Sequence, residues 1–473
     1  MARKSNSVAR RLLIISYHFP PDGAIGGQRW AGLSKYLARL GWEVHVVTAS
    51  APGGEPSVPN VHRHVRPRRR TLNDIYKSGT RRFRAPAAGD QPSHAGDLSP
   101  QPRFASFRAL DLLRTVVSSA MDLPDHGRGW VTRAAGAARE LIAEGGFDVV
   151  ISTGPPHSAH FAGLLATRGT TVPLWVDMRD PWSMTYKTHL PPDRFIRAER
   201  FFLRGLERLV FRRAARVIVN TREFASALRS EQADVDVVYF PNGIDLERMA
   251  ARDLEAVQPG SIAHVGTLYG NRSLSSVFAA MAATLGDSGV AADALRLNVA
   301  GPVESSHRAR MHAEIEAAGL ASVVNIHGVL PRSKALELLS RAHVALVLAQ
   351  NQPMCVPAKL YESVGLGVPT LVIAESTSAA ANEARRIGAM TVDGGDLAGI
   401  RAVFGDMLSG RIPTRIEPKT PISYEYLAVQ MDNLLQDAIA AKTNKARGSG
   451  LAFQVSGQST LPQAERAVRR RLL

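Results

Sequence analysis

Short runs of apolar, often β-branched residues alternate along the chain with longer stretches whose apolar residues recur every three or four positions. Apolar runs without polar alternation are typical of strands covered on both faces, and the longer stretches are typical of amphipathic helices. Helical patterns such as 29–40 and 131–144 separate the runs. The alternation predicts an α/β fold with doubly wound parallel sheets. The predicted strands cover residues 12–16, 43–48, 148–152, 173–177, 216–220, 261–266, 296–301, 323–328, 344–349 and 369–374.

The length of the chain and its turn signals predict two domains. A chain of 473 residues exceeds the size at which one hydrophobic core stops growing. We expect a first domain over residues 10–240, interrupted over 52–102 by an irregular basic insertion rich in Pro, Gly, Ser and Arg. A cluster of turn residues then begins a second domain over 241–423. A terminal helix over 424–441 and a flexible basic tail over 442–473 follow.

The composition restricts the cellular setting that we expect. The single cysteine, Cys355, excludes an intramolecular disulfide and fits a reducing compartment. No apolar run approaches the roughly 18 residues of a membrane span. The apolar run Leu12–Ser16 behind the basic N-terminus is too short for the core of a signal peptide. We therefore expect a cytoplasmic protein.

The net charge of +16 at pH 7 is concentrated in three clusters. It allows three interpretations: attraction to an anionic membrane surface, contact with nucleic acid, and an ordinary solvated surface. Nucleic acid is disfavoured as a partner because no nucleic-acid-binding motif accompanies the charge. Peripheral contact with the inner face of the plasma membrane therefore stays a candidate. The clusters are Arg63, Arg66, Arg68, Arg69, Arg70, Lys77, Arg81, Arg82 and Arg84; Arg194, Arg197, Arg200, Arg204, Arg208 and Arg212, at helical spacing; and Arg466, Arg469, Arg470 and Arg471.

The segment Pro357–Ile373 carries the most specific chemistry in the chain. It predicts a short helix with Lys359 and Glu362, then a Gly-rich turn and a buried strand. Residues three apart share one face of a helix. A cation and a carboxylate at the carboxyl edge of a parallel sheet suit a nucleotide sugar, because the cation can hold phosphate and the carboxylate can hold a ribose diol. The alternative is an ordinary exposed ion pair on a helix.

Five motifs in a fixed order carry a family resemblance. They are Ser16–Arg29, Val176-Asp-Met-Arg-Asp-Pro-Trp182, Phe240-Pro-Asn-Gly-Ile-Asp245, His264-Val-Gly-Thr-Leu-Tyr-Gly-Asn-Arg272 and Pro357–Ile373. From about residue 10 to residue 440, the chain resembles family 4 glycosyltransferases of the GT-B fold. The second motif is similar to a loop in a bacterial subgroup that builds surface polysaccharides from lipid-linked sugars.

The resemblance implies both a fold and an activity. The fold is two Rossmann-like domains that face each other across a cleft, with a C-terminal helix that packs back on the first domain. The activity is retaining transfer of a hexosyl or N-acetylhexosaminyl group from a UDP- or GDP-linked sugar. The implied acceptor is a lipid-linked sugar or a polysaccharide at the cytoplasmic membrane face. The resemblance implies neither an essential metal nor another cofactor.

The resemblance also assigns site residues. The catalytic candidates are Asp180, near the attacking hydroxyl, and His157, in a loop after a strand. Asp177, Arg179 and Trp182 are expected on the acceptor side. The charged residues of this loop could equally form an internal salt bridge, and Trp182 could pack the loop. The donor is expected to contact Gly26, Gly27, Gly266, Arg272, Lys359, Leu360 and Glu362.

Two departures from the family pattern leave other functions open. The first of the family's two glutamates falls on Met354, and Gly266 is followed by Thr267 rather than by an arginine. A non-catalytic nucleotide-sugar-binding protein and a GT-B nucleotide-sugar epimerase are therefore alternatives.

Overall fold

The computed structural model describes residues 10–22, 24–51, 57–71, 74, 123–184, 194–249, 253, 256–270 and 272–452. The chain divides into two compact units, one up to Ala428 and one from Val429 onward. Most of the expected insertion over 52–102 lies outside the described residues, as does the expected tail beyond Ala452. Among the helices of the described part, none is long and apolar enough to cross a membrane.

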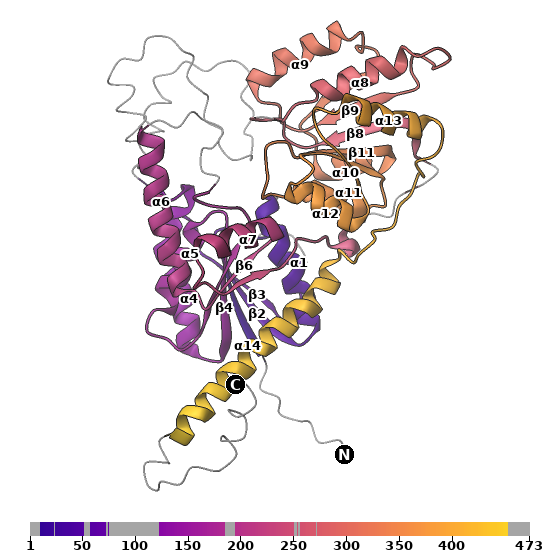
Figure 1. Cartoon of the computed structure of the whole chain (residues 1–473). Helices are drawn as coiled ribbons and strands as arrows, with labels where there is room; N and C mark the ends of the chain where they lie inside the picture. Colours follow the sequence, from indigo (N-terminus) through magenta and orange to yellow (C-terminus); the bar gives the residue numbers. More distant parts are fainter. Residues whose placement is uncertain are drawn as a thin grey trace, which may run out of the picture. The chain divides into compact units, whose positions relative to one another are not determined.

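The first α/β domain is built on a seven-stranded parallel sheet with the order β3-β2-β1-β4-β5-β6-β7. Figure 1 shows α4, α5 and α6 on one side of this sheet and α1 on the other. The strands are β1 (Arg10–Ser16), β2 (Trp42–Thr48), β3 (Val61–Val65), β4 (Phe147–Gly154), β5 (Leu174–Met178), β6 (Arg216–Val219) and β7 (Val237–Tyr239). The helices are α1 (Ile25–Arg39), η1 (His126–Trp130), α4 (Val131–Glu144), α5 (Ser158–Thr167), α6 (Arg194–Arg213) and α7 (Arg222–Glu231).

The second α/β domain has a six-stranded parallel sheet with the order β10-β9-β8-β11-β12-β13. Its strands are β8 (Gln258–Val265), β9 (Arg296–Ala300), β10 (Val324–Gly328), β11 (Ala342–Leu348), β12 (Thr370–Ile373) and β13 (Met390–Val392). The helices are η2 (Leu246–Arg248), α8 (Ser275–Leu285), α9 (Ser305–Ala317), α10 (Arg332–Arg341), α11 (Ala358–Gly365), α12 (Ala379–Ile387), α13 (Leu397–Leu408) and α14 (Tyr424–Ala452).

The predicted doubly wound parallel sheets are confirmed in both domains, and all ten predicted strands are present. Their apolar runs are buried; all of the side chains from Leu12 to Ser16 in β1 are buried, for example. The sequence pattern misses β3, β7 and β13, which are short and contain few buried side chains. The strand β3 lies within the expected irregular insertion, so part of that segment is regular and pairs with β2. The terminal helix expected over 424–441 is the first part of α14, which continues through 442–452, so the flexible tail expected from residue 442 begins with a helical segment.

The strand order places a ligand-binding edge on each sheet. In the first sheet β1 lies between β2 and β4, and in the second sheet β8 lies between β9 and β11. In each sheet, the strands that follow the first one in sequence are added on one side of it, and the later strands are then added on its other side. Open α/β sheets bind ligands beyond the carboxyl ends of the strands at such a switch point. The loops after β1, β4, β8 and β11 are thus the places to look for a site.

Helix α1 holds the turn that joins the two sheets. Arg29, of which 2% is exposed, donates from Nη1 to the carbonyl of Pro241 at 2.6 Å and to Oδ1 of Asn242 at 2.8 Å. Its Nη2 donates to the carbonyl of Phe240 at 2.9 Å. The same guanidinium lies 3.3 Å from Oδ1 of the fully buried Asp177 at the end of β5. One buried cation therefore connects the first sheet to the interdomain turn.

The next turns of α1 extend this contact. Lys35 Nζ lies 2.9 Å from Oδ2 of Asp245, and the hydroxyl of Tyr36 donates to Oδ1 of the same carboxylate at 2.9 Å. A Cβ on Gly32 would lie 2.1 Å from the ring of Tyr424, the first residue of α14. Only glycine therefore allows this close approach between the two helices.

Removing the buried cation tests the anchoring role of α1. We expect Arg29→Ala to lower the free energy of unfolding by about 3–5 kcal/mol, because it leaves the buried carboxylate of Asp177 without its charged partner. Urea unfolding followed by far-UV circular dichroism measures the loss. The control is Arg39→Ala on the same helix, whose ion pair with Glu247 is half exposed and should contribute little. Similar, small losses in both variants would contradict the anchoring role.

Candidate active site

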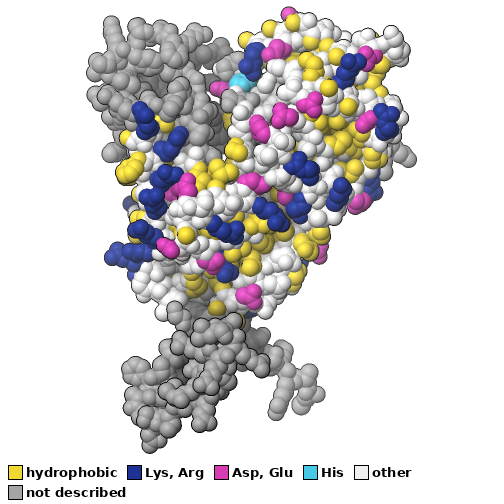
Figure 2. Space-filling model, viewed as in Figure 1, with side chains coloured by type: hydrophobic (Ala, Val, Ile, Leu, Met, Phe, Trp, Pro, Cys, Tyr) yellow, Lys and Arg dark blue, Asp and Glu magenta, His cyan; other side chains and the backbone are white. Residues whose placement is uncertain are grey.

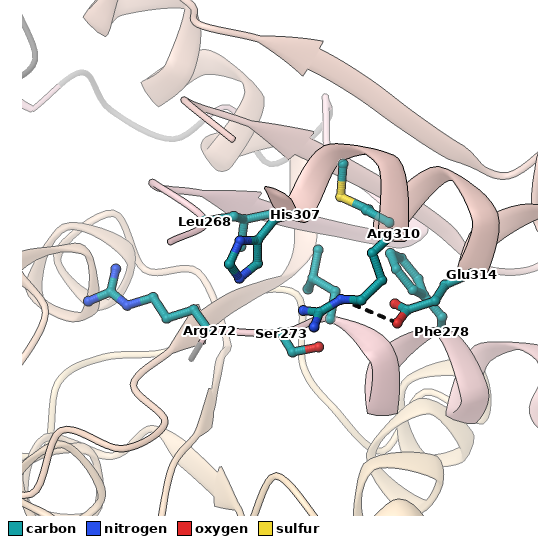
Figure 3. A pocket seen from close by; sticks show the side chains of 9 residues that line it. Leu268, Arg272, Ser273, Phe278, His307, Arg310 and Glu314 are labelled. Atoms are coloured by element: carbon teal, nitrogen blue, oxygen red, sulfur yellow. Dashed lines mark ion pairs between the residues drawn. The ribbon is translucent and has the colours of Figure 1, made fainter. Parts of the chain in front are cut away.

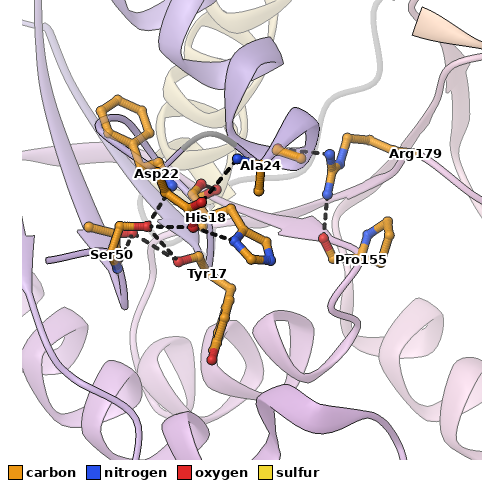
Figure 4. Close-up of polar contacts among 11 residues, drawn as sticks. Tyr17, His18, Asp22, Ala24, Ser50, Pro155 and Arg179 are labelled. Atoms are coloured by element: carbon orange, nitrogen blue, oxygen red, sulfur yellow. Dashed lines mark hydrogen bonds and ion pairs between the residues drawn. The ribbon is translucent and has the colours of Figure 1, made fainter. Parts of the chain in front are cut away.

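Arg179 clamps the loops that follow β1, β4 and β5. Its Nη1 donates to the carbonyl of Gly26 at 2.7 Å, and its Nε donates to the carbonyl of Gly154 at 3.1 Å. Its Nη2 donates to the carbonyl of Pro155, and Figure 4 shows this contact. Three backbone carbonyls thus engage the guanidinium. Arg179 therefore shapes the edge of the sheet through backbone carbonyls, and its expected place on the acceptor side stays a prediction.

Gly26 and Gly27, at the start of α1, are packed against neighbouring backbone and side-chain atoms. A Cβ on Gly26 would lie 3.0 Å from Nη2 of Arg179, and a Cβ on Gly27 would lie 3.0 Å from the backbone carbonyl of His18. The loop itself therefore requires small residues here. Their expected contact with a donor stays a prediction.

The loop after β1 is held by Asp22 and bordered by aromatic rings. Asp22 accepts from the backbone N–H of Ala24 at 3.0 Å and lies 2.6 Å from Nδ1 of His18, as Figure 4 shows. Tyr17 packs edge-on against His126, with ring centroids 5.5 Å apart. This aromatic wall escapes sequence analysis, because its members come from two segments far apart in the chain.

Asp177 lies inside the domain. Its Oδ2 accepts from Nε1 of Trp30 at 2.7 Å and from the hydroxyl of Thr153 at 2.7 Å, and its side chain is fully buried. Its other oxygen faces Arg29. Asp177 therefore takes the internal salt-bridge role, and its position does not support the expected contact with an acceptor.

His157 and Trp182 form a buried aromatic pair behind the sheet edge. Their rings stack with centroids 4.7 Å apart and planes 15° apart. Burial lowers the pKa of His157 well below its usual value, so the imidazole is neutral. Its Nδ1 has no hydrogen-bond partner among the described residues. Trp182 packs the loop, the second of its two expected roles, whereas His157 keeps one ring nitrogen available.

Asp180 is exposed, unlike the other acidic residue of this loop. Protein atoms crowd its carboxyl group and raise its pKa, although solvent still reaches the side chain. Its charge acts on Cys355 of the second domain: burial raises the pKa of that thiol to about 12, and the negative charge of Asp180 adds to the shift. Asp180 therefore lies near the loop that precedes α11.

Arg272 supplies a cation from the loop after β8. Its Nη2 donates to Oε1 of Gln352 at 3.1 Å, and its guanidinium lies 4.6 Å from the ring centroid of Tyr269. Arg272 borders a small cavity, and Figure 3 shows its side chain pointing away from His307 and Arg310, which also line this cavity. The cavity has a volume of about 10 Å³, roughly the space of one water molecule. It is too small for a nucleotide, so Arg272 is the relevant feature of this loop.

Lys359 and Glu362 form a partly buried ion pair at the start of α11. Lys359 Nζ lies 2.6 Å from Oε2 of Glu362, and Nη1 of Arg332 lies 2.9 Å from Oε1. Only 6% of the glutamate side chain is exposed, against 24% for Lys359. Burial alone would raise the pKa of Glu362, but the charges of Lys359 and Arg332 outweigh it and hold the pKa below its usual value. The pair is therefore not the ordinary exposed ion pair considered as an alternative.

The pKa of His264 is influenced by the charges of both Arg272 and Lys359. Its Nδ1 donates to the carbonyl of Leu346 at 3.0 Å, and burial lowers its pKa to about 4. The charges of Arg272 and Lys359 also lower this pKa, so both cations lie near the carboxyl end of β8. Gly266 follows directly; a Cβ there would lie 3.3 Å from the ring of His264.

Two side chains of the segment 354–360 do not offer a donor the contacts that the family pattern would suggest. The side chain of Leu360 is fully buried in the core around β12, so it is not available to a donor. Met354 stands where the family has its first glutamate, and its side chain packs against the core of the first domain. Its carbonyl accepts from the hydroxyl of Thr221 at 2.9 Å. Met354 therefore contributes an apolar contact rather than a carboxylate.

Comparison with known proteins agrees with this geometry. Residues 26–243 match the family model of a glycosyl transferase 4-like domain. A search of curated protein sequences finds no match. The matched region begins inside α1 and covers the rest of the first domain, including the loops after β4 and β5. The match covers 26–243 of 473 residues and shows similarity of the first domain to this family model.

Several solved structures share the fold of this chain at low sequence identity. Sucrose-phosphate synthase from Thermosynechococcus elongatus aligns over 91% of this chain and 100% of its own, with 15% identity and a TM-score of 0.55. Trehalose-6-phosphate synthase OtsA aligns over 92% and 99%, with 15% identity and a TM-score of 0.53. Anabaena HepE with UDP and glucose aligns over 93% and 99%, with 13% identity and a TM-score of 0.51. These likenesses establish the GT-B fold.

Two groups of expected site residues act on each other electrostatically. The charges of Arg272 and Lys359 both lower the pKa of His264, and the charge of Asp180 helps to raise the pKa of Cys355. The sequence analysis missed Arg332, which completes the pairing of Glu362. Its position directly after Pro331, at the start of the helix that follows β10, was a usable signal.

Proposed function

We propose that this protein is a retaining glycosyltransferase. It moves a hexosyl or N-acetylhexosaminyl group from a UDP- or GDP-linked donor to a lipid-linked or polysaccharide acceptor. The observation that carries the proposal is the partly buried Lys359–Glu362 pair at the start of α11, with Arg272 nearby. In an ordinary exposed ion pair both side chains are in solvent, whereas here the carboxylate is 6% exposed and has two cationic partners.

The cations and the carboxylate would bind different parts of the donor nucleotide. Arg272 and Lys359 would hold the diphosphate, together with the backbone N–H groups at the start of α11. Each oxygen of Glu362 already accepts one cationic donor, and each carboxylate oxygen has a second lone pair. Glu362 can therefore accept from the hydroxyls of a ribose while it stays paired. The structure of HepE with UDP and glucose makes UDP the first nucleotide to test.

The chemistry follows from this charge distribution. The bond between the anomeric carbon and the diphosphate oxygen breaks as the acceptor oxygen attacks from the same face. The cations stabilise the negative charge that develops on the leaving diphosphate. Its departing oxygen takes the proton of the acceptor hydroxyl, so no divalent ion and no strong base are required. Asp180 would orient that hydroxyl.

An anionic membrane surface is the proposed partner of α6. Its exposed apolar side chains Phe201, Phe202 and Leu209 are 78%, 51% and 46% exposed. Where Figure 1 places α6, Figure 2 shows Lys and Arg side chains interspersed with hydrophobic ones. Arginines beside exposed aromatic rings are typical of helices that lie in the headgroup region of an anionic bilayer. The position suits an enzyme with a lipid-linked acceptor.

Loss of the Lys359 cation tests the proposed transfer. We expect Lys359→Ala to reduce sugar transfer by at least about 100-fold, because one preorganised group that stabilises developing charge is lost. The purified protein is incubated with bacterial membranes as the source of acceptor and with a labelled UDP- or GDP-linked sugar, in which the sugar is glucose, galactose or N-acetylglucosamine. The label in lipid-extractable and polymeric products is then measured.

The matched control for this test is Lys334→Ala. Lys334 forms the same i,i+3 pair with Glu337, at 2.8 Å, but on the exposed face of α10. It should leave transfer unchanged. Equal turnover in wild type and Lys359→Ala, with unchanged circular dichroism, would reject the proposed donor site. Reactions without acceptor detect an epimerase, because a converted nucleotide sugar would then accumulate. The variant Asp180→Asn in the transfer assay tests whether Asp180 orients the acceptor hydroxyl.

Liposome flotation tests the membrane contact. We expect Phe201→Ser combined with Phe202→Ser to weaken partition onto phosphatidylglycerol vesicles about tenfold, because a fully buried Phe contributes about 1.5–3 kcal/mol. Binding of the wild type should fall at high salt. Val329→Ser is the control, since Val329 is 71% exposed but lies in the second domain. The membrane proposal fails if wild-type recovery is absent or identical at low and high salt.

A further inference from the structure

A cluster of imidazoles lies on the edge of the first sheet, away from the carboxyl-end loops. His45 on β2 pairs in register with His62 on β3, and His64 follows two residues later on the same strand. The ring of His45 contacts both partners, with centroids 4.8 Å from His62 and 5.2 Å from His64. Glu43 stands two residues before His45. Because successive side chains of a strand alternate between faces, all four side chains share one face of the β2–β3 pair.

The atoms of this cluster are close enough to share one ion. His45 Nδ1 and His64 Nε2 are 3.0 Å apart, and one ligand atom from each of Glu43, His45 and His62 lies within 4.8 Å of the others. Two imidazole nitrogens bound to one tetrahedral Zn²⁺ at about 2.0–2.1 Å stand roughly 3.4 Å apart. His45 thus lies within reach of both His62 and His64, and rotation of the rings would have to direct one nitrogen of each at a common point.

Glu43 and Arg11 decide which nitrogen of His45 is available. Glu43 Oε1 lies 2.7 Å from His45 Nε2, which favours a proton on that nitrogen and leaves the lone pair on Nδ1. Arg11 Nη2 lies 3.2 Å from both Glu43 Oε1 and His45 Nε2. The guanidinium is held there by the carbonyl of Gly145 at 2.6 Å and by the ring of Phe147. The positive charge therefore lies on the Nε2 side, and the Nδ1 side faces imidazoles.

We propose that His45 Nδ1, His62 and His64 bind one divalent transition-metal ion, and that Glu43 orients His45 from outside the coordination sphere. A carboxylate that accepts from the second nitrogen of a ligating histidine is a common support of such sites. Three neutral imidazoles suit Zn²⁺, Co²⁺, Ni²⁺ or Cu²⁺ and are poor ligands for Mg²⁺ or Ca²⁺. This ion would be separate from the sugar-transfer chemistry.

The proposed role of the ion is to fasten the sheet edge. The strand β3 ends the sheet and pairs only with β2 among the described strands. An ion held by side chains of both strands would fix their register. The segment that follows β3 is attached to η1 through Arg69, whose N–H donates to the carbonyl of Gly129 at 3.0 Å. A fastened β3 would therefore also steady this segment.

Metal binding to the full-length, tag-free protein tests the proposal. After dialysis against EDTA and removal of the chelator, ZnCl₂ is titrated by calorimetry, and CoCl₂ is followed by its visible ligand-field absorption. We expect one ion per chain and a higher melting temperature with Zn²⁺ than with MgCl₂. His62→Ala should abolish this binding; His62 is exposed, so its replacement should not prevent folding.

Two further variants separate a built site from a chance cluster. Glu43→Gln should weaken Zn²⁺ binding by about 10–100-fold, the usual effect of losing a supporting carboxylate. His312→Ala removes an exposed histidine on α9 and should change nothing. The proposal is overturned if the wild type binds no Zn²⁺ at micromolar concentration. It is equally overturned if His62→Ala and His312→Ala bind the ion as the wild type does, since both results mean that the imidazoles only hydrogen-bond to one another.

Discussion

The buried charge of Arg29 is the constraint on which the arrangement of the first domain and the interdomain turn depends. It faces the fully buried carboxylate of Asp177 and donates to the turn that begins the second domain. A buried cation with several fixed acceptors has few alternative positions, because each alternative would leave charges without partners. The same helix begins at Ile25, and the next residue, Gly26, lies against the guanidinium of Arg179. One helix thus connects the domain junction to the edge where a ligand would bind.

The two domains divide the proposed chemistry between them. The second domain concentrates fixed positive charge, with Arg272 and Lys359 both acting on the neutral His264. The first domain contributes a neutral histidine and an exposed aspartate at the end of its sheet. Positive charge next to a leaving diphosphate and a carboxylate next to an acceptor hydroxyl are what glycosyl transfer requires. Met354 replaces one carboxylate of the family pattern with an apolar contact, so any sugar contact of that glutamate must be supplied elsewhere.

The fold was largely predictable from sequence because parallel strands covered on both faces leave continuous apolar runs. The short strands β3, β7 and β13 lack this signal, since few of their side chains are buried. The site was less predictable. The motif around Lys359 and Glu362 was visible, but the burial of Glu362 and its second partner Arg332 depend on how α10 and α11 pack. Asp177 could not be assigned to the interior from its local sequence, because its partners Trp30 and Arg29 come from α1.

Nucleotide binding is the most direct test of the proposed donor site. A thermal-shift and calorimetry series with UDP, GDP and ADP would be run on the wild type and on Glu362→Gln. The account predicts that one nucleoside diphosphate stabilises the wild type, by about 2.7 kcal/mol at a concentration of 100 times its Kd. This stabilisation should be lost or strongly reduced in Glu362→Gln. Absence of stabilisation by every nucleotide, or equal stabilisation of both proteins, would contradict the assignment of α11 as the donor-binding helix.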